Sequence, residues 1–363
     1  MPQPTTAAPD DAGGKAKKRP APVPPRPSAS ILLVSPTNEV LLLHRVQTSS
    51  SFPSAHVFPG GNCDALHDGA VPAPGDAARH RDGAAYRRAG VRECFEESGI
   101  LLARRSGNGA ESGGGGRGSA APLLHVEREE RERARREVHA GKRPFGDVLR
   151  AWGAAADLDG LVPFTRWVTP ANVPKRFTTQ MYLYFMPLPP SAAAAEAAGD
   201  GLPREEEAVI PAPTSDGGIE HTAARFLPPA AWTRLARDGE IILFPPQFFL
   251  LHLVSQHLAP AAADGSPLPA EALQRQRDSL LEFVREGGWG DKVISPSMSA
   301  RRKSDGRIVL GLDKPGPELE GSGREGVRDY VVLVDFRKEG PRRVEVRLRD
   351  EVLAEERAQK EKL

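Results

Sequence analysis

The chain has 363 residues and a mass of 39.1 kDa, enough for one large or two ordinary domains. Its 49 Lys and Arg residues stand against 48 Asp and Glu residues, so the net charge of +1 gives no overall attraction to nucleic acid or to an anionic membrane. The two cysteines exclude a disulfide framework, and the longest apolar runs are far shorter than the ~20 residues that span a membrane. With 36 Gly and 35 Pro residues, the composition indicates a folded core with disordered inserts.

The N-terminal region predicts a tail followed by two buried strands. Residues 1–28 are rich in Pro, Ala and Lys and lack apolar periodicity, which is typical of a solvated tail. Order is expected to begin at Ser30, with strands at 31–34 and 40–43 around a turn. Apolar runs on both sides of that turn indicate strands that are buried on both faces.

The middle and C-terminal regions alternate between helical and strand patterns. Residues 84–104 predict one helix, 106–121 a flexible Gly-rich loop, and 127–139 a charged helix on the surface. Further strands are expected at 162–168, 177–186, 222–227, 307–312, 330–336 and 343–348, helices at 228–237, 247–258 and 270–286, a surface insert at 190–218, and a charged helix at the C-terminus.

Three glutamates in the 84–104 helix are the strongest sign of chemistry. Glu93, Glu96 and Glu97 are spaced i, i+3 and i+4, so a helix places their carboxylates on one face. Such crowding is unfavourable unless a cation or an arginine lies among the carboxylates. Mg²⁺ prefers oxygen ligands of this kind, and Arg92 lies four residues before Glu96. A solvated acidic face is the alternative when the helix is taken alone.

A glycine turn upstream makes the metal interpretation stronger. Phe58-Pro59-Gly60-Gly61 combines a fixed proline with two glycines that let the backbone approach a ligand closely. Such a turn beside an acidic helix can add a backbone carbonyl to the side-chain carboxylates. Together the two segments predict a cradle for a metal ion and a diphosphate.

These two segments together resemble the signature of the Nudix hydrolases. That signature runs Gly, five residues, Glu, seven residues, and then Arg-Glu-hydrophobic-any-Glu-Glu-any-Gly-hydrophobic, and residues 92–100 match its second half throughout. The first half departs, because Gly61 lies 31 positions before Arg92, so about 17 residues, roughly 64–82, are inserted. Ala84 stands where the separate first glutamate of the signature would be.

Further segments resemble one branch of the family, the mammalian Nudix motif-19 proteins and their fungal relatives. The segments are residues 45, 52–61, 91–102, 167–170, 175–179 and 243–247. That branch acts on coenzyme A and acyl-CoA, so the resemblance implies release of 3′,5′-ADP and (acyl-)phosphopantetheine. It also implies a small-molecule substrate as the partner, with no nucleic acid and no membrane span, and it leaves the oligomeric state open.

The resemblance implies roles for the residues of the two segments. Glu96 and Glu97 would be the main ligands of one to three Mg²⁺ or Mn²⁺ ions, and the Gly60 carbonyl would complete the ligand set. Glu93 would be a further ligand or the general base, and Arg92 would orient the carboxylates. A later loop often supplies another base or ligand. Glu220 is the best candidate, with residues 205–207 as rivals.

Several residues are candidates for contact with the substrate. Arg45, Lys175 and Arg176 are placed to meet phosphates, with ordinary surface positions as the alternative. Phe177 is a candidate for stacking on adenine, although packing in a strand is the competing interpretation. Cys94 is expected to be a small core residue, because no partner base is evident.

The sequence therefore predicts an α/β/α Nudix sandwich with a mixed sheet over residues 29–258. Disordered inserts are expected near 64–82, 106–121 and 190–218, and residues 259–363 are expected to form an accessory extension of a helix and a small antiparallel sheet. By resemblance the compartment is mitochondrial or peroxisomal, with the cytosol open. The final Glu-Lys-Leu is a poor version of the peroxisomal Ser-Lys-Leu signal.

Three other functions compete with CoA hydrolysis. Within the enzyme class, the rival substrates are NADH, ADP-ribose and similar dinucleotides. A catalytically silent nucleotide sensor is favoured by the missing signature glutamate, but crowded carboxylates argue against a pure binding protein. RNA binding through the basic residues at 15–19 and 128–136 is disfavoured by the net charge of +1 and by glutamates within the second stretch.

Overall fold

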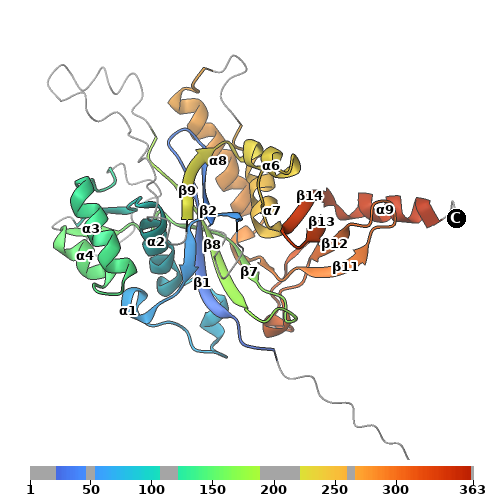
Figure 1. The fold of residues 1–363 in the computed structure, drawn as a ribbon, viewed down its shortest axis with the longest axis horizontal. Coiled ribbons are helices and arrows are strands. Elements are labelled where there is room, and N and C mark those ends of the chain that lie inside the picture. Colours follow the sequence, from blue (N-terminus) through green and yellow to red (C-terminus); the bar gives the residue numbers. More distant parts are fainter. Residues whose placement is uncertain (1–21, 46–53, 107–121, 189–220, 260–265, 361–363) are drawn as a thin grey trace, which may run out of the picture.

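A mixed β-sheet forms the centre of the molecule (Figure 1). The computed structural model describes residues 22–45, 54–106, 122–188, 221–259 and 266–360. The sheet has the strand order β10-β7-β8-β1-β2-β3, with β4 beside β1 and β9 beside β2. Its strands are β1 (Arg26–Val34), β2 (Val40–Arg45), β3 (His56–Val57), β4 (Gly60–Asn62), β7 (Val162–Val168), β8 (Phe177–Phe185), β9 (His221–Leu227) and β10 (Val293–Ile294). β1 runs parallel to β8 and antiparallel to β2, so the predicted mixed sheet is confirmed.

Strand β1 contributes to a core on each side of the sheet. Ile31 and Leu33 belong to one hydrophobic cluster, whereas Leu32 and Val34 belong to another, as the alternation of side chains along a strand requires. The prediction that this strand is buried on both faces is confirmed. The strand begins at Arg26 and not at Ser30, because residues 26–30 already pair with β8 and β4.

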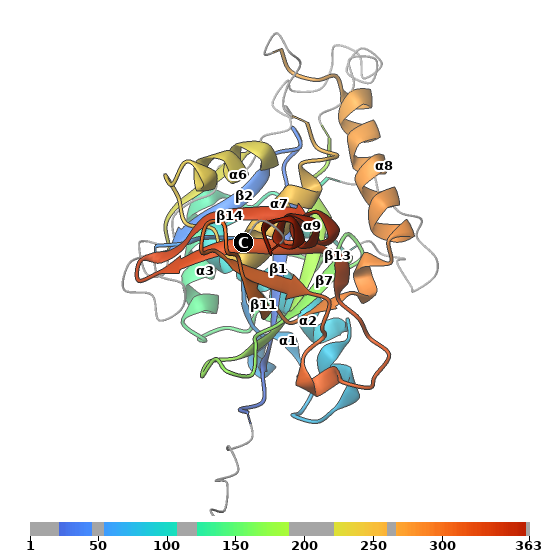
Figure 2. The same cartoon turned by 90° about the vertical axis from the view of Figure 1, so that its right-hand side faces the viewer.

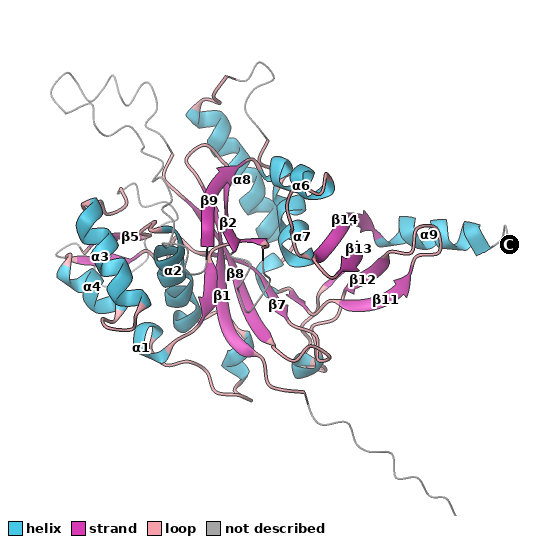
Figure 3. Ribbon diagram, in the orientation of Figure 1, coloured by secondary structure: helices cyan, strands magenta, loops and turns pink. Residues whose placement is uncertain are grey.

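Helices cover both faces of the sheet (Figure 3). One hydrophobic cluster joins the sheet to α2 (Ala84–Ser98), α3 (Arg128–His139) and α4 (Phe145–Ala151). The other joins it to α6 (Pro229–Arg237), α7 (Pro245–Val254) and α8 (Ala270–Glu286). The predicted α/β/α sandwich is therefore confirmed. Within the described parts of the chain, no helix is both long and apolar enough to cross a membrane.

Helix α2 ends six residues earlier than the sequence pattern predicts. Gly99 adopts a left-handed conformation with φ of 73°, and its amide donates to the Phe95 carbonyl, which closes the helix. The chain then turns into β5 (Ala103–Arg105), which pairs with β6 (Ala154–Ala156) in a separate two-stranded sheet. The apolar side chain of Leu102 that suggested a longer helix is buried in the core beyond this turn.

The predicted disorder of residues 64–82 is wrong. The segment forms α1 (Ala65–Asp68) and the 3₁₀ helix η1 (Ala77–His80). Asp64 and Asp76 begin these helices, because their carboxylates accept from amides two residues later, at 2.7 and 2.8 Å. Arg166 of β7 donates to the carbonyl of Arg81 at 2.7 Å and fixes the end of the segment to the sheet. The predicted inserts at 106–121 and 190–218 lie outside the described residues, except for residue 106.

The C-terminal region forms an antiparallel sheet that the second view shows beside α6 and α7 (Figure 2). Its strands are β11 (Ser297–Arg301), β12 (Ile308–Leu312), β13 (Val327–Arg337) and β14 (Gly340–Leu348), with η2 (Trp289–Asp291), η3 (Pro317–Leu319) and the terminal helix α9 (Arg349–Lys360). The predicted helix and small antiparallel sheet are thus present. Val332 and Val344 share one hydrophobic cluster with Leu32 of β1, and β10 extends the main sheet. The C-terminal region is therefore continuous with the rest of the fold.

One buried arginine ties α8 to the main sheet. Arg277 donates to the Asn38 side chain at 2.7 Å and to the carbonyls of Met186 and Ser35 at 2.7 and 2.8 Å. Asn38 has a positive φ of 61° in the turn between β1 and β2, and its amide donates to the Leu273 carbonyl of α8 at 3.0 Å. The guanidinium thus satisfies backbone acceptors that would otherwise be buried without partners.

We expect Arg277→Ala to lower the free energy of unfolding by about 2–4 kcal/mol, because it leaves three buried acceptors without their charged donor. Urea denaturation followed by circular dichroism measures the loss. Arg285→Ala on the same helix is the control, since its side chain is 62% exposed and it should change stability by less than about 0.5 kcal/mol. Equal effects of the two substitutions would contradict the role given to Arg277.

Candidate active site

The carboxylates of α2 are divided between a cavity and the protein interior. Glu93 and Glu97 line a cavity of about 1690 Å³ together with the backbone of Gly60 and Gly61. The Gly60 amide donates to the Glu97 carboxylate at 2.8 Å, which fixes that side chain toward β4. Glu96, one turn along from Arg92, does not line the cavity. The helix therefore presents two of its three glutamates to the cavity.

The guanidinium of Arg92 holds the carboxylates in place. It donates to Glu93 and Glu96 at 2.8 Å each, to Asp68 at 2.9 and 3.1 Å, and to the Asn62 carbonyl at 2.8 Å. Arg92 and Asp68 are both buried, so water screens these ion pairs little. The predicted orienting role of Arg92 agrees with this geometry.

Asp68 supplies a carboxylate that the sequence motifs did not indicate. Ala84 stands where the signature has its first glutamate, but Asp68 at the end of α1 makes a two-pronged contact with Arg92. Its carboxylate also accepts from the Asp64 amide at 2.8 Å and has no exposure to solvent. The residue lies within the segment that was expected to be disordered, so no local pattern pointed to it.

Glu96 is held away from the cavity by α3. His139 Nδ1 lies 3.3 Å from the Glu96 carboxylate, and Arg135 Nε donates to the Glu96 carbonyl at 2.6 Å. Ala134, Arg135 and Val138 are buried against the neighbouring elements. The expectation that residues 127–139 form a solvated surface helix is therefore wrong for one face of α3, because that face supports the backbone of α2.

Both glycines of β4 are required by close contacts. The strand pairs with the start of β1, with Gly60 opposite Ser30 and Gly61 opposite Ala29. A Cβ on Gly60 would lie 2.4 Å from the Ala29 carbonyl oxygen, whereas one on Gly61 would lie 2.4 Å from the Glu93 carboxylate. A side chain at Gly60 would displace the backbone, and one at Gly61 would displace Glu93. The predicted close approach of the backbone therefore needs glycine at these positions.

The donor set of this cavity fits a hard divalent cation in part. Within the described residues, no group of three or more His, Cys, Asp or Glu side chains is arranged to hold a metal ion. Two carboxylates, Glu93 and Glu97, do face the same cavity, and the Glu93 carboxylate occupies the space that a side chain at Gly61 would need. Mg²⁺ usually binds through one or two carboxylates together with substrate phosphates and waters, so two such ligands match its chemistry.

The electrostatics at Glu93 also favour a cation. Burial raises the pKa of Glu93 to about 7, against the opposing charge of Arg92, and the negative charges of Glu96 and Asp68 contribute to the rise. A nearby cation would stabilise the ionised carboxylate and lower this pKa. The buried position of Glu93 therefore favours a positive charge beside its carboxylate.

Three of the four predicted substrate contacts, namely Arg45, Lys175 and Phe177, lie at the cavity. Arg45 and Phe177 both line it, and the Lys175 ammonium lies 5.9 Å from the centre of the Phe177 ring. Arg176 does not line it. Its buried guanidinium pairs with Glu318 and donates to the carbonyls of Val23 and Thr169. The prediction for Arg176 is corrected accordingly, because its charge is used to anchor η3.

Two further predictions concern Cys94 and the additional glutamate from a later part of the chain. Cys94 is fully buried, and burial raises the pKa of its thiol to about 12, as expected for a core residue and not for a nucleophile. Glu220 and the rival glutamates at 205–207 lie outside the described residues, so Glu220 stays a prediction.

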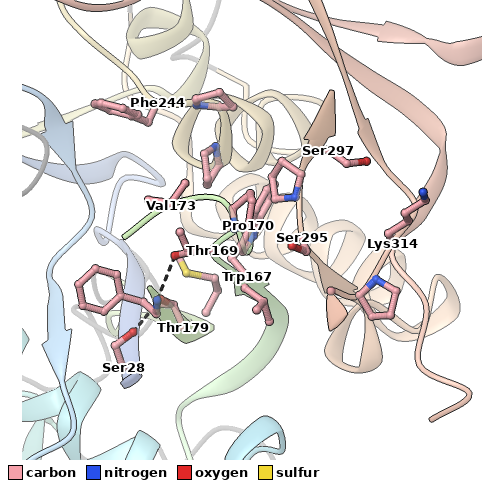
Figure 4. A pocket seen from close by; sticks show the side chains of 18 of the residues that line it. Ser28, Trp167, Thr169, Pro170, Val173, Thr179, Phe244, Ser295, Ser297 and Lys314 are labelled. Carbon is pink, nitrogen blue, oxygen red and sulfur yellow. Dashed lines mark hydrogen bonds between the residues drawn. The ribbon is translucent and has the colours of Figure 1, made fainter. Parts of the chain in front are cut away.

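The far wall of the cavity comes from the C-terminal region, which sequence reasoning did not connect with the site. Figure 4 shows the loop that carries Pro170 and Val173 on one side and Ser297 and Lys314 on the other. At the base of the picture Ser28 and Thr179 share a hydrogen bond of 2.7 Å between β1 and β8. More than 100 positions separate the two walls in the chain, so no motif spacing indicated their contact.

The comparisons with known proteins find curated relatives that are named as Nudix hydrolases, although no family model matches the chain. It is 27% identical over 232 residues to nudix hydrolase 7 from Caenorhabditis elegans, which is 64% of this chain and 61% of that protein. It is 28% identical over 252 residues to acyl-coenzyme A diphosphatase NUDT19 from Gallus gallus, which is 59% of this chain and 60% of that protein. A crystal structure of a NUDIX hydrolase from Alicyclobacillus acidocaldarius has a TM-score of 0.42 and 24% identity, and covers 63% of this chain and 90% of that one.

The chain spans about 60% of the length of the curated relatives that it matches. Together with residues 92–100, these relatives confirm the predicted resemblance to the Nudix hydrolase superfamily.

We expect Gly60→Ala to be more destabilising than Gly61→Ala. The new methyl at Gly60 meets backbone atoms of Ala29 and Ser30 and should cost about 1–3 kcal/mol, whereas the methyl at Gly61 meets the movable end of Glu93 and should cost less than about 1 kcal/mol. Chemical denaturation measures both. Gly146→Ala in α4 is the control, because its nearest neighbour is an arginine nitrogen at 3.6 Å. A larger loss at Gly61 than at Gly60 would contradict the contacts.

Proposed function

We propose that the chain is a divalent-metal-dependent diphosphatase that cleaves CoA or acyl-CoA to 3′,5′-ADP and (acyl-)phosphopantetheine. The single observation that carries the proposal is the placement of Glu93 and Glu97 in one cavity, with Arg92 and the Gly60 amide fixing their orientation. The similarity to a protein named acyl-coenzyme A diphosphatase supports the choice of substrate.

The reaction is hydrolysis of a phosphoric anhydride. A water oxygen forms a bond to one phosphorus, the bridging P–O bond breaks, and two phosphate monoesters leave with the protons of the water shared between them and the solvent. A bound Mg²⁺ or Mn²⁺ supplies charge neutralisation on the diphosphate and lowers the pKa of water. Glu93, Glu97 and the Gly60 carbonyl would hold the ion, and the Glu93 carboxylate is alternatively placed to accept the proton from water.

The supporting residues act through position. Arg92 orients Glu93, and Asp68 orients Arg92. The orientation of the Glu93 carboxylate therefore depends on two linked ion pairs. Glu96 is paired with Arg92 and His139 outside the cavity lining, and we propose that it positions Arg92 and α3. Arg45 and Phe177 are proposed to contact the substrate at the cavity wall.

The rival functions differ in how well the site supports them. The argument for a silent sensor rested on the missing signature glutamate, and Asp68 now supplies a carboxylate to Arg92. Dinucleotides such as NADH and ADP-ribose contain the same diphosphate, so product analysis has to separate them from CoA.

Product analysis is the test of the proposed function. Protein incubated with CoA, an acyl-CoA, NADH or ADP-ribose is expected to release 3′,5′-ADP from the CoA compounds in Mg²⁺ or Mn²⁺, and none in EDTA. Glu97→Gln removes a negatively charged ligand and should lower the rate by about a hundredfold or more. Glu282→Gln on the exposed face of α8 is the matched control and should keep the full rate. Cleavage of NADH or ADP-ribose alone would overturn the CoA assignment, and no turnover at all would favour the sensor.

We expect Asp68→Asn to weaken metal binding without removing a metal ligand. The neutral amide no longer balances Arg92, which is then drawn toward Glu93 and Glu96 and competes with a cation for them. Losing such a supporting contact typically lowers metal affinity by about 10–100-fold. Mn²⁺ titration by electron paramagnetic resonance measures the change, and Asp64→Asn is the control for the same segment. Unchanged Mn²⁺ affinity in a folded Asp68→Asn variant would contradict the positioning role.

A further inference from the structure

The cavity extends well beyond the glutamates. Its volume of about 1690 Å³ exceeds the roughly 300–1,000 Å³ of pockets that enclose a drug-sized ligand. Glu93 and Glu97 lie on the wall formed by the main sheet and α2, whereas β11, β12 and the segment 313–321 form much of the opposite wall. A diphosphate and its metal ions occupy only the first of these regions, so the second is available to another part of the substrate.

Exposed apolar side chains surround the second region, with Met298 of β11 and Phe336 of β13 in the C-terminal region and Val173 on the facing loop between β7 and β8. Val173, Met298 and Phe336 are 38%, 67% and 48% exposed, and all three line the cavity. They are three of the seven large hydrophobic side chains that are exposed within the described residues. Apolar side chains that remain exposed around a hollow mark a binding surface more often than chance exposure does.

This wall is held rigidly against the main sheet. Arg176, which directly precedes β8, pairs with Glu318 of η3, and the Ser295 amide donates to the Lys314 carbonyl at 2.7 Å. Gly316 packs so closely that a Cβ there would lie 3.2 Å from Ser295 and 3.4 Å from Val168. The wall is thus formed before any ligand binds, which reduces the entropy cost of binding.

Two arginines of the wall are paired with neighbouring acidic side chains. Arg349 pairs with Asp313 at 2.7 Å, and Arg328 pairs with Glu325 at 3.0 Å. Guanidinium groups engaged in this way are poorly disposed to bind further phosphates. Lys314 and Arg324 line the same wall, so basic side chains border the exposed apolar side chains of Met298 and Phe336.

We propose that the C-terminal wall binds the acyl chain of an acyl-CoA substrate. The protein would then bind acyl-CoA more tightly than free CoA. The inference rests on the proposed function and assigns to residues 295–336 a part of substrate recognition. The diphosphate lies at Glu93 and Glu97, and the acyl chain lies against Val173, Met298 and Phe336. Longer acyl chains bury more apolar surface on this wall and bind more tightly.

Calorimetric binding of CoA, acetyl-CoA, hexanoyl-CoA and dodecanoyl-CoA in EDTA tests the proposal, with cleavage of the same compounds in Mg²⁺ followed separately. Burying two methylenes is worth about a tenfold gain in affinity, so dodecanoyl-CoA should bind at least about a hundredfold more tightly than CoA. Cleavage of CoA together with equal affinities for all four compounds would overturn the inference and leave the proposed function standing. Absence of both binding and cleavage for all four would overturn the proposed function, and the inference with it.

Substitutions locate the effect on the wall. The double variant Met298→Asp with Phe336→Asp should lower the ratio of dodecanoyl-CoA to CoA affinity about tenfold or more, because charge replaces apolar surface. Leu353→Asp is the matched control, since Leu353 is 46% exposed on α9 and does not line the cavity. All three substituted side chains are exposed, so the variants are expected to fold, and circular dichroism checks this. An unchanged ratio in the folded double variant would overturn the inference.

Discussion

The buried contact between Arg92 and its carboxylates is the interaction on which the candidate site depends. Asp68, Glu93 and Glu96 would repel one another at this spacing without a cation, and the guanidinium of Arg92 supplies that charge in a place that water barely reaches. With Glu93 and Glu96 held by one group, the helix can direct Glu93 and Glu97 into the cavity. Burial keeps the pKa of Glu93 raised in spite of Arg92, and a divalent cation beside its carboxylate would lower that pKa.

The same constraint explains why distant parts of the chain meet here. α1 brings Asp68 to Arg92, β4 brings glycines beside Glu93 and Glu97, and α3 holds the backbone of α2 through Arg135. On the other side, β10 joins the main sheet and Arg176 anchors η3, so the C-terminal sheet closes the cavity. The C-terminal region is thus built into the site, where the sequence suggested an accessory extension.

Local patterns predicted much of this arrangement, and their limits are physical. The spacing of Glu93, Glu96 and Glu97 and the glycines at 60 and 61 depend on one helix and one turn, so they were readable from the sequence. The role of Asp68 was not, because its partner lies 24 positions away across a Gly- and Pro-rich segment that resembles a disordered loop. Arg176 looked like a phosphate contact, yet its partner Glu318 lies 142 positions away and removes it from the cavity.

A crystal structure of the protein grown with Mn²⁺ would test whether Glu93 and Glu97 bind a divalent cation, because anomalous scattering locates the ion independently of activity. We expect Mn²⁺ in the cavity, bound by carboxylate oxygens of Glu93 and Glu97, with Arg92 still paired with Asp68. Mn²⁺ bound at other residues, or carboxylates of Glu93 and Glu97 that turn away from a bound ion, would contradict it.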